Sequence, residues 1–332
     1  ADEDPRRLAL YPPESGVRCF PSARALLASG TVDAVLIATP HYSHPALGAA
    51  ALRAGKHVLV EKPIAVHKAD ARRLLAAHTN RRLVFGAMFN QRTDPCYARL
   101  RELIQAGELG RLQRMNWIIT NWFRTHAYYA SGGWRATWAG EGGGVLLNQC
   151  PHQLDLWQWL FGMPARVRAF CGFGRHHPIE VEDDVTAVLE YANGATGVFI
   201  ATTGEAPGTN RLEVAGELGK AVLEGDHLTL HRNAVSATTF SRTTKERFAA
   251  PAVTTTEITF PNHGDQHLGI LRNFVAAIRD GAELLAPAAD GLPSVELANA
   301  MLLSGARNAT VNLPLNARAY QAFLRERIRS AR

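Results

Sequence analysis

Residues 1–88 alternate between apolar segments of strand type and helical segments, at the short spacing of βαβ units. The run Val32–Ala38 is rich in β-branched residues and stops at Thr39–Pro40. The last strand-type run, 83–88, lacks polar alternation, as expected for a strand covered on both sheet faces. We expect strands at 32–38, 56–60 and 83–88, and helices at 45–54 and 69–78. The pattern predicts a doubly wound α/β domain with a parallel sheet over residues 1–88.

The pattern changes from about Phe89 onward, where strands are grouped between helices. Helices are expected at 95–107, 144–161, 265–279 and 294–308, and strands at 112–123, three times within 165–201, at 212–222 and at 257–260. The polar stretch 236–256 is expected to be loose. This grouping predicts an α+β domain with an open, largely antiparallel sheet over residues 89–332.

The α/β domain opens without the glycine-rich phosphate loop that such domains normally carry, because no Gly-x-Gly-x-x-Gly precedes Val32. The acidic opening Ala1–Pro5 is typical of the end of the second strand of such a domain. We therefore expect roughly 30 residues of one βαβ unit to precede Ala1 in the whole protein. The alternative is a divergent domain that has lost this loop.

Composition limits the function classes. The 332 residues are 46% hydrophobic, enough for a large core and two domains. The net charge of +6 comes without any run of five or more like charges, so we predict no nucleic-acid partner. Four scattered cysteines form no C-x-x-C pair, which predicts neither disulfides nor a metal site and favours a reducing, cytoplasmic location. Apolar runs stay below the ~18 residues of a membrane span.

Lys62 follows a strand of buried type, within the motif Glu61-Lys62-Pro63. Open α/β sheets bind ligands at the carboxyl ends of their strands, so the ammonium should emerge at that crevice. There it could donate to a substrate hydroxyl and stabilise a developing alkoxide. Pro63 restricts Lys62 to extended conformations, which favours this role over that of an ordinary surface lysine.

His152 lies four residues after Asn148 and three before Asp155, behind the glycine run 142–144. This spacing predicts one shared polar face on a helix, opposite an apolar stripe. A neutral imidazole there could accept a hydroxyl proton, and Asp155 or Asn148 could orient it. A structural histidine is the alternative, and Asn148 could equally cap the helix.

The ordered motifs resemble the glucose-fructose oxidoreductase, inositol dehydrogenase and MocA family over essentially the whole chain. They are Thr39-Pro40-x-x-x-His44-Pro45, Glu61-Lys62-Pro63, Trp134-Arg135, Gly142-Gly143-Gly144, His152-x-x-Asp155 and Asp290-Gly291…Glu296-x-x-Asn299-Ala300. The resemblance implies NAD or NADP in a Rossmann domain, a substrate between the domains and oligomerisation through the carboxyl-terminal sheet. Many members have aspartate where this chain has Asn148. An asparagine side chain, unlike an aspartate, cannot take a proton.

The resemblance also assigns site residues. It places Glu61 and Lys62 beside the cofactor, together with Thr39 and Pro40 at a strand end; His44 could contact the cofactor or simply pack at a helix start. Trp134 and Arg135 offer an aromatic face and planar donors of the kind that bind sugars. With Asn148 and Asp155 they form the expected substrate site.

Asp2 is the candidate ligand of the adenosine ribose. An acid at the end of the second strand accepts from the ribose hydroxyls and repels a 2′-phosphate, so this reading favours NAD, with NADP possible. A charged linker is an equally good explanation.

These expectations describe a cytoplasmic NAD(P)-dependent oxidoreductase that oxidises a secondary hydroxyl of a cyclitol, sugar or glycoside, with His152 as base and Lys62 assisting. A homo-oligomer, dimer or tetramer, is expected. Two alternatives remain: an NAD-retaining hydrolase or lyase that oxidises a sugar transiently, and a non-catalytic NAD or sugar sensor.

Overall fold

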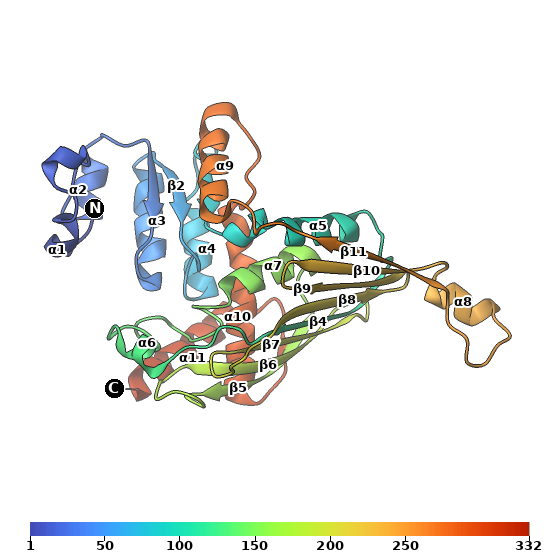
Figure 1. Ribbon diagram of the computed structural model, residues 1–332. Coiled ribbons are helices and arrows are strands. Elements are labelled where there is room, and N and C mark those ends of the chain that lie inside the picture. Colours follow the sequence, from blue (N-terminus) through green and yellow to red (C-terminus); the bar gives the residue numbers. More distant parts are fainter. Residues whose placement is uncertain (332) are drawn as a thin grey trace.

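The computed structural model describes residues 1–331, which form two sheets with helices around them (Figure 1). The smaller sheet has the order β1-β2-β3 and is parallel. Its strands are β1 (Ala34–Ile37), β2 (His57–Val60) and β3 (Phe85–Ala87). α3 (His44–Arg53) packs against its strands and against α4 (Lys68–Ala76), whereas α1 (Pro5–Leu8) and α2 (Ala23–Ala28) lie to one side, beyond α3 (Figure 1).

The register of the small sheet aligns its strand ends. Ile37 pairs with Val60, which pairs in turn with Ala87, so the carboxyl ends of all three strands lie at one edge. β2 is buried along almost its whole length, which explains the continuous apolar run of its sequence. Residues that follow these strands are therefore delivered to a common edge.

The larger sheet has the order β11-β10-β9-β8-β4-β7-β6-β5-β12 and is antiparallel except for the pair β4–β7. Its strands are β4 (Leu112–Ile119), β5 (Arg166–Phe173), β6 (Glu182–Glu190), β7 (Thr196–Thr202), β8 (Asn210–Gly216), β9 (Gly219–Glu224), β10 (His227–Asn233), β11 (Val253–Thr259) and β12 (Val311–Asn312). The later helices are α5 (Pro95–Gln105), α6 (His126–Ala130), α7 (Pro151–Phe161), α8 (Ala237–Thr243), α9 (Gln266–Asp280), α10 (Gly291–Arg307) and α11 (Ala317–Ser330). The expected α/β domain followed by an α+β domain with an open, largely antiparallel sheet is confirmed.

One face of the large sheet is packed and the other is open. α10 lies against β5 and against α7, and the inward side chains of β5–β7 join this core. Phe170 and Val188 point outward and are exposed. The expected use of this open face for oligomerisation stays a prediction.

The domain boundary drawn at 88/89 also stays a prediction. The apolar core around β1–β3 includes Ile270 and Phe274 of α9 and Val295 of α10, so later segments return to cover the small sheet. α9 stands beside the small sheet in Figure 1. The short η3 (Asn90–Thr93) and η4 (Ala288–Asp290) lie at this junction; η1 (Pro13–Ser15) and η2 (His41–Ser43) lie earlier.

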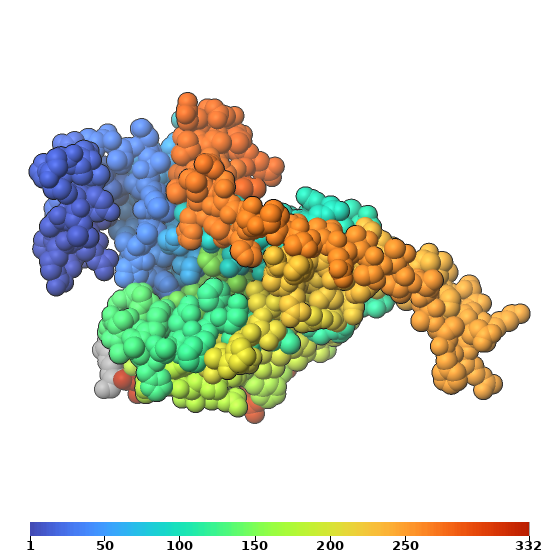
Figure 2. Space-filling model, in the orientation of Figure 1, coloured from blue at the N-terminus to red at the C-terminus, as the bar shows by residue number. Residues whose placement is uncertain are grey.

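The stretch 236–256, expected to be loose, contains α8 and the first residues of β11. It projects from the body as an arm in Figures 1 and 2, and Phe248 there is fully exposed. Within residues 1–331, none of the helices is long and apolar enough to cross a membrane.

Candidate active site

Lys62 stands two residues beyond β2, at the edge where the parallel strands end. Its Nζ donates to the backbone carbonyl of Asn148 at 2.8 Å, and its backbone N–H donates to a carboxylate oxygen of Glu61 at 3.1 Å. Burial lowers the pKa of Lys62, while the negative charge of Glu61 acts in the opposite direction. The ammonium thus links the segment after β2 to the segment before α7, and its role toward a substrate stays a prediction.

His152 lies in the first turn of α7 and is only 9% exposed, so it is more buried than the expected polar face. Its ring packs edge-on against Phe89, with 6.5 Å between the ring centroids. Burial, followed by the nearby cation of Lys62, lowers its pKa well below the usual value. The imidazole is therefore neutral at physiological pH.

The expected helix over 144–161 is wrong for its first seven residues, because α7 begins at Pro151. The buried Glu182 carboxylate accepts from the backbone N–H groups of Gly144 (2.8 Å) and Leu146 (2.9 Å), which holds this segment in turns. A Cβ at Gly144 would lie 1.9 Å from the carbonyl oxygen of Glu182. The glycine run thus allows a close approach to β6, and tertiary contacts override the local helical pattern.

Asn148 consequently shares no helix face with His152, and it is not the cap of α7; Cys150 holds that position without a side-chain hydrogen bond. The Asn148 amide donates to Glu141, and its side-chain oxygen accepts from Tyr128 Oη at 3.4 Å. Asn148 therefore belongs to a polar cluster beside Lys62.

The structure corrects the expected role of Asp155. Its two carboxylate oxygens accept from Arg92 Nε (2.8 Å) and Nη2 (2.6 Å), and both side chains are 1% exposed. Arg92 also pairs with Asp290 at 2.7 Å. Asp155 thus fixes α7 to η3 and η4, and neither Asp155 nor Asn148 hydrogen-bonds the His152 ring. Within residues 1–331, the buried Nδ1 of His152 has no hydrogen-bond partner.

A cavity of about 690 Å³ lies beyond the end of β1. Its lining includes Asp2, Thr39, Pro40, Tyr42 and Trp134. A carboxylate, a hydroxyl and apolar walls at the carboxyl end of a parallel strand suit the adenosine and ribose of a dinucleotide.

His44 does not line this cavity. The ring is 1% exposed, with Nδ1 2.8 Å from the carbonyl oxygen of Pro63 and Nε2 2.6 Å from that of Thr39. The His44 ring thus joins the ends of β1 and β2, as the packing alternative expects, and a direct contact of His44 with the cofactor stays a prediction.

Trp134 and Arg135 lie on the segment between α6 and α7, and Trp134 lines the cavity beyond β1. Trp134 is 37% exposed, and the Arg135 guanidinium carbon lies 4.8 Å from its ring centroid. Arg135 also donates to Tyr128 Oη at 3.1 Å, which connects it to Asn148.

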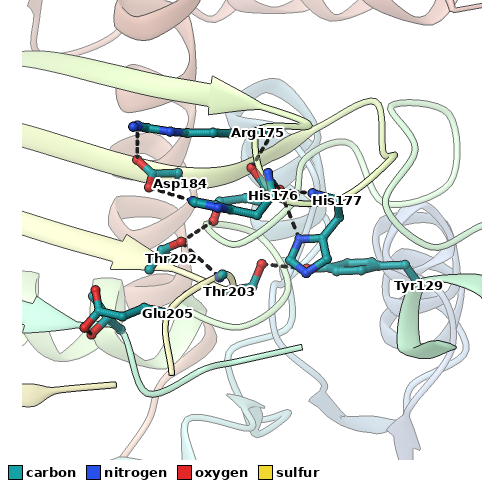
Figure 3. A network of polar contacts seen from close by, with 11 residues as sticks. Tyr129, Arg175, His176, His177, Asp184, Thr202, Thr203 and Glu205 are labelled. Carbon is teal, nitrogen blue, oxygen red and sulfur yellow. Dashed lines mark hydrogen bonds and ion pairs between the residues drawn. The ribbon is translucent and has the colours of Figure 1, made fainter. Parts of the chain in front are cut away.

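A separate network anchors α6, which carries Tyr128. Figure 3 shows Tyr129 reaching Thr203 beside His177. The His177 ring contacts Asp183 at 3.0 Å and the carbonyl oxygen of Arg124 at 2.9 Å, which ties the start of this segment to the large sheet. The segment from Arg124 to α6, which carries Tyr128, is thus fixed to the large sheet.

Sequence reasoning missed Glu141, Tyr128 and Gln149. Glu141 is 1% exposed, and Gln149 Nε2 lies 3.3 Å from the Asn148 side-chain oxygen. The position of Glu141 directly before the glycine run was the available signal. Residues 1–331 contain no group of three His, Cys, Asp or Glu side chains placed to hold a metal ion.

The parallel sheet has a cavity at its carboxyl edge and is followed by a second domain. This is the arrangement of a dinucleotide-binding protein. Residues 1–89 match the oxidoreductase family with an NAD-binding Rossmann fold, and residues 97–222 match the GFO/IDH/MocA C-terminal domain. The chain belongs to the Gfo/Idh/MocA family of oxidoreductases, and its amino-terminal domain is an NAD-binding Rossmann domain.

Two curated relatives match most of the chain. Levoglucosan dehydrogenase of Pseudarthrobacter phenanthrenivorans is 25% identical over 324 residues, covering 88% of this chain and 82% of its own. Inositol 2-dehydrogenase of Rhizobium meliloti is 25% identical over 87% of this chain and 83% of its own. The WlbA dehydrogenase of Bordetella pertussis, solved with NADH and UDP-GlcNAcA, has a TM-score of 0.78 and 26% identity over 95% of this chain and 89% of its own.

Proposed function

We propose that this oxidoreductase uses NAD to oxidise a secondary hydroxyl of a sugar, cyclitol or glycoside. The observation that carries the proposal is the Lys62 ammonium just beyond the end of β2, close enough to lower the pKa of the neutral His152 imidazole. It lies at the same sheet edge as Thr39 and Pro40, which line the cavity. The relatives support the substrate class, because they are named for levoglucosan and inositol.

Lys62 would polarise the substrate oxygen. An ammonium has three N–H donors, and the Asn148 carbonyl uses one of them. Two donors are left for an alkoxide that develops as the carbon is oxidised. A fixed cation in a partly buried site stabilises that charge more strongly than water would.

His152 would accept the hydroxyl proton. Its lowered pKa keeps the ring unprotonated, so that a ring nitrogen is available as a base. Contact with Phe89 and the fixed start of α7 orient the ring in place of the expected carboxylate.

NAD, when bound, supplies the hydride acceptor. Asp2, Thr39 and Pro40 would hold its adenosine half through the cavity they line, and Glu61 would lie beside the nicotinamide half. Trp134, Arg135 and Asn148 would contact the neighbouring hydroxyls of the substrate, with Arg135 as a planar donor.

The test is nicotinamide absorbance at 340 nm with the complete protein, NAD or NADP, and a panel of inositols, aldoses, levoglucosan and glycosides. Reduction of NAD by one substrate class, lost in His152→Ala while NADH still binds, is the expected result. Cleavage of a glycoside without net reduction would replace this proposal by a cofactor-retaining hydrolase. Ligand binding without turnover, unaffected by His152→Ala, would indicate a sensor.

A further inference from the structure

Glu141 is a buried carboxylate beside the site, and the proposed roles of Lys62 and His152 leave it unused. Its side chain is 1% exposed, although a carboxylate is seldom buried without partners. One oxygen accepts from the backbone N–H of Ala136 at 2.7 Å, and the other accepts from the Asn148 amide. Both partners are neutral, and among residues 1–331 no cation forms a salt bridge with Glu141. Burial raises the pKa of this carboxyl, and the charges of Arg135 and Lys62 act against that effect without contact.

Lys62 shows the complementary situation. Its ammonium contacts the Asn148 carbonyl, and among residues 1–331 no carboxylate forms a salt bridge with it. Lys62 is therefore a buried cation without a contacting acid, and Glu141 is a buried acid without a contacting cation. The two lie on either side of Asn148. Asn148 connects them, because its amide binds Glu141 and its carbonyl binds Lys62.

Asn148 supplies no negative charge of its own, so the acids that act on the Lys62 ammonium are Glu61 and Glu141. Asparagine can hold a neighbour in place, but it carries no charge to balance the ammonium. Glu141 lies seven residues earlier in the chain, and the turns around the glycine run return it to the Asn148 side chain. Burial lowers the pKa of Lys62, while Glu61 and Cys150 raise it; the negative charge of Glu141 adds more weakly to their effect, and the cation of Arg124 lowers the pKa.

We propose that Glu141 is a positioning residue that fixes Asn148 and, through it, keeps the Lys62 ammonium charged and aimed at the substrate oxygen. This inference rests on the proposed function of Lys62. A purely structural Glu141 would only hold the turn through Ala136, and the ionisation of Lys62 would not depend on it.

The first test measures the ionisation of Lys62 without requiring turnover. Trace labelling of the complete protein with acetic anhydride across a pH series, read by mass spectrometry, gives the pH at which Lys62 becomes reactive. The exposed Lys245 on the arm serves as the internal reference. In Glu141→Gln the loss of a negative charge should move the Lys62 midpoint to lower pH, whereas Glu102→Gln, at an exposed position of α5, should not move it. An unchanged midpoint in folded Glu141→Gln overturns the inference.

A charge swap provides the second test. Asn148→Asp puts two carboxyl groups in contact, so turnover should fall, by about tenfold or more. The double variant Glu141→Gln with Asn148→Asp restores one carboxyl and one amide in contact, and should recover most of that loss. Additive losses in folded protein would contradict a shared charge.

The two proposals fail in different ways. If Lys62→Ala leaves turnover intact, the proposed function of Lys62 is wrong. If Lys62→Ala abolishes turnover while Glu141→Gln changes neither the labelling midpoint nor the alkaline limb of kcat/KM, only the inference about Glu141 is wrong.

Discussion

Two lysines six residues apart, Lys62 and Lys68, occupy the two ends of the loop after β2, and their surroundings differ. Lys68 is 1% exposed; its Nζ donates to Glu296 at 2.5 Å and to the Leu315 carbonyl at 2.8 Å. Lys62 donates to one carbonyl and forms no salt bridge among the described residues. The Lys68 cation is thus neutralised by an acid, whereas Lys62 keeps N–H donors free.

The difference separates a structural cation from a functional one. Around Lys68 the Asn299 side chain also accepts from the lysine backbone N–H at 3.0 Å, so α4 is locked to α10. Two of the three ammonium N–H groups are bound, the charge is paired with Glu296, and the side chain is 1% exposed, so a ligand cannot reach it. A buried ammonium with unused donors gains most when a substrate oxygen arrives.

The most severe test of this contrast is Lys68→Met. The change leaves Glu296 buried without its cation, so the free energy of unfolding should fall by about 3–5 kcal/mol. Urea unfolding followed by circular dichroism measures this loss. Adding Glu296→Leu should recover much of it, and a loss below about 1 kcal/mol would show that the pair contributes little.

Lys62→Met should have the opposite effect, with a large loss of activity and little loss of stability. With its substrate-facing donors removed, kcat/KM should fall by roughly 10²–10³-fold. The melting temperature should stay close to that of the parent protein, because no buried acid loses a contacting partner. Initial rates and differential scanning fluorimetry give the two readings, and a variant that loses stability but retains turnover would reverse the assignment of the two lysines.

A subtler effect of Lys62 concerns the ionisation of His152. Burial is the main cause of the lowered His152 pKa, and the Lys62 cation adds to it. Removing that cation in Lys62→Met should raise the pKa, so the ring would take up its proton at a higher pH than in the parent. NMR titration of the histidine C2 protons, assigned with His152→Gln, measures the shift, and Lys68→Met should move it little.

Much of the fold follows from burial. The apolar runs of β1–β3 are recognisable because strands covered on both faces need no polar residues, and the Lys62 site follows from where β2 ends. β10 and α11 were missed, since the sequences of both are rich in polar residues. The helix expected from Gly144 was wrong because Glu182, distant in sequence, binds the backbone of that segment.

The site was less predictable than the fold. Lys62 and His152 carry their own signals, a strand end and a helix start, but Glu141 matters only through the turn that brings it back to Asn148. The family motifs also mix two kinds of residue. Glu296 and Asn299 hold the loop after β2 through Lys68, and Asp155 holds α7 through Arg92. In this structure all three bind other side chains or the backbone of the fold. A pattern of residues in sequence cannot separate these roles, because the distinction depends on which donors remain unpaired after folding.

The Lys68–Glu296 pair is expected to contribute to the free energy of unfolding because it is buried, and an exposed ion pair provides the comparison. Arg99 and Glu102 on α5 lie 2.8 Å apart with 42% and 63% of their side chains exposed. Water screens such a pair and both long side chains lose freedom in forming it, so Glu102→Gln should change the free energy of unfolding by less than about 0.5 kcal/mol. Urea unfolding beside Lys68→Met checks this. A loss comparable to that of Lys68→Met would mean that proximity alone sets the strength of these pairs, and the contrast between buried and exposed cations would no longer hold.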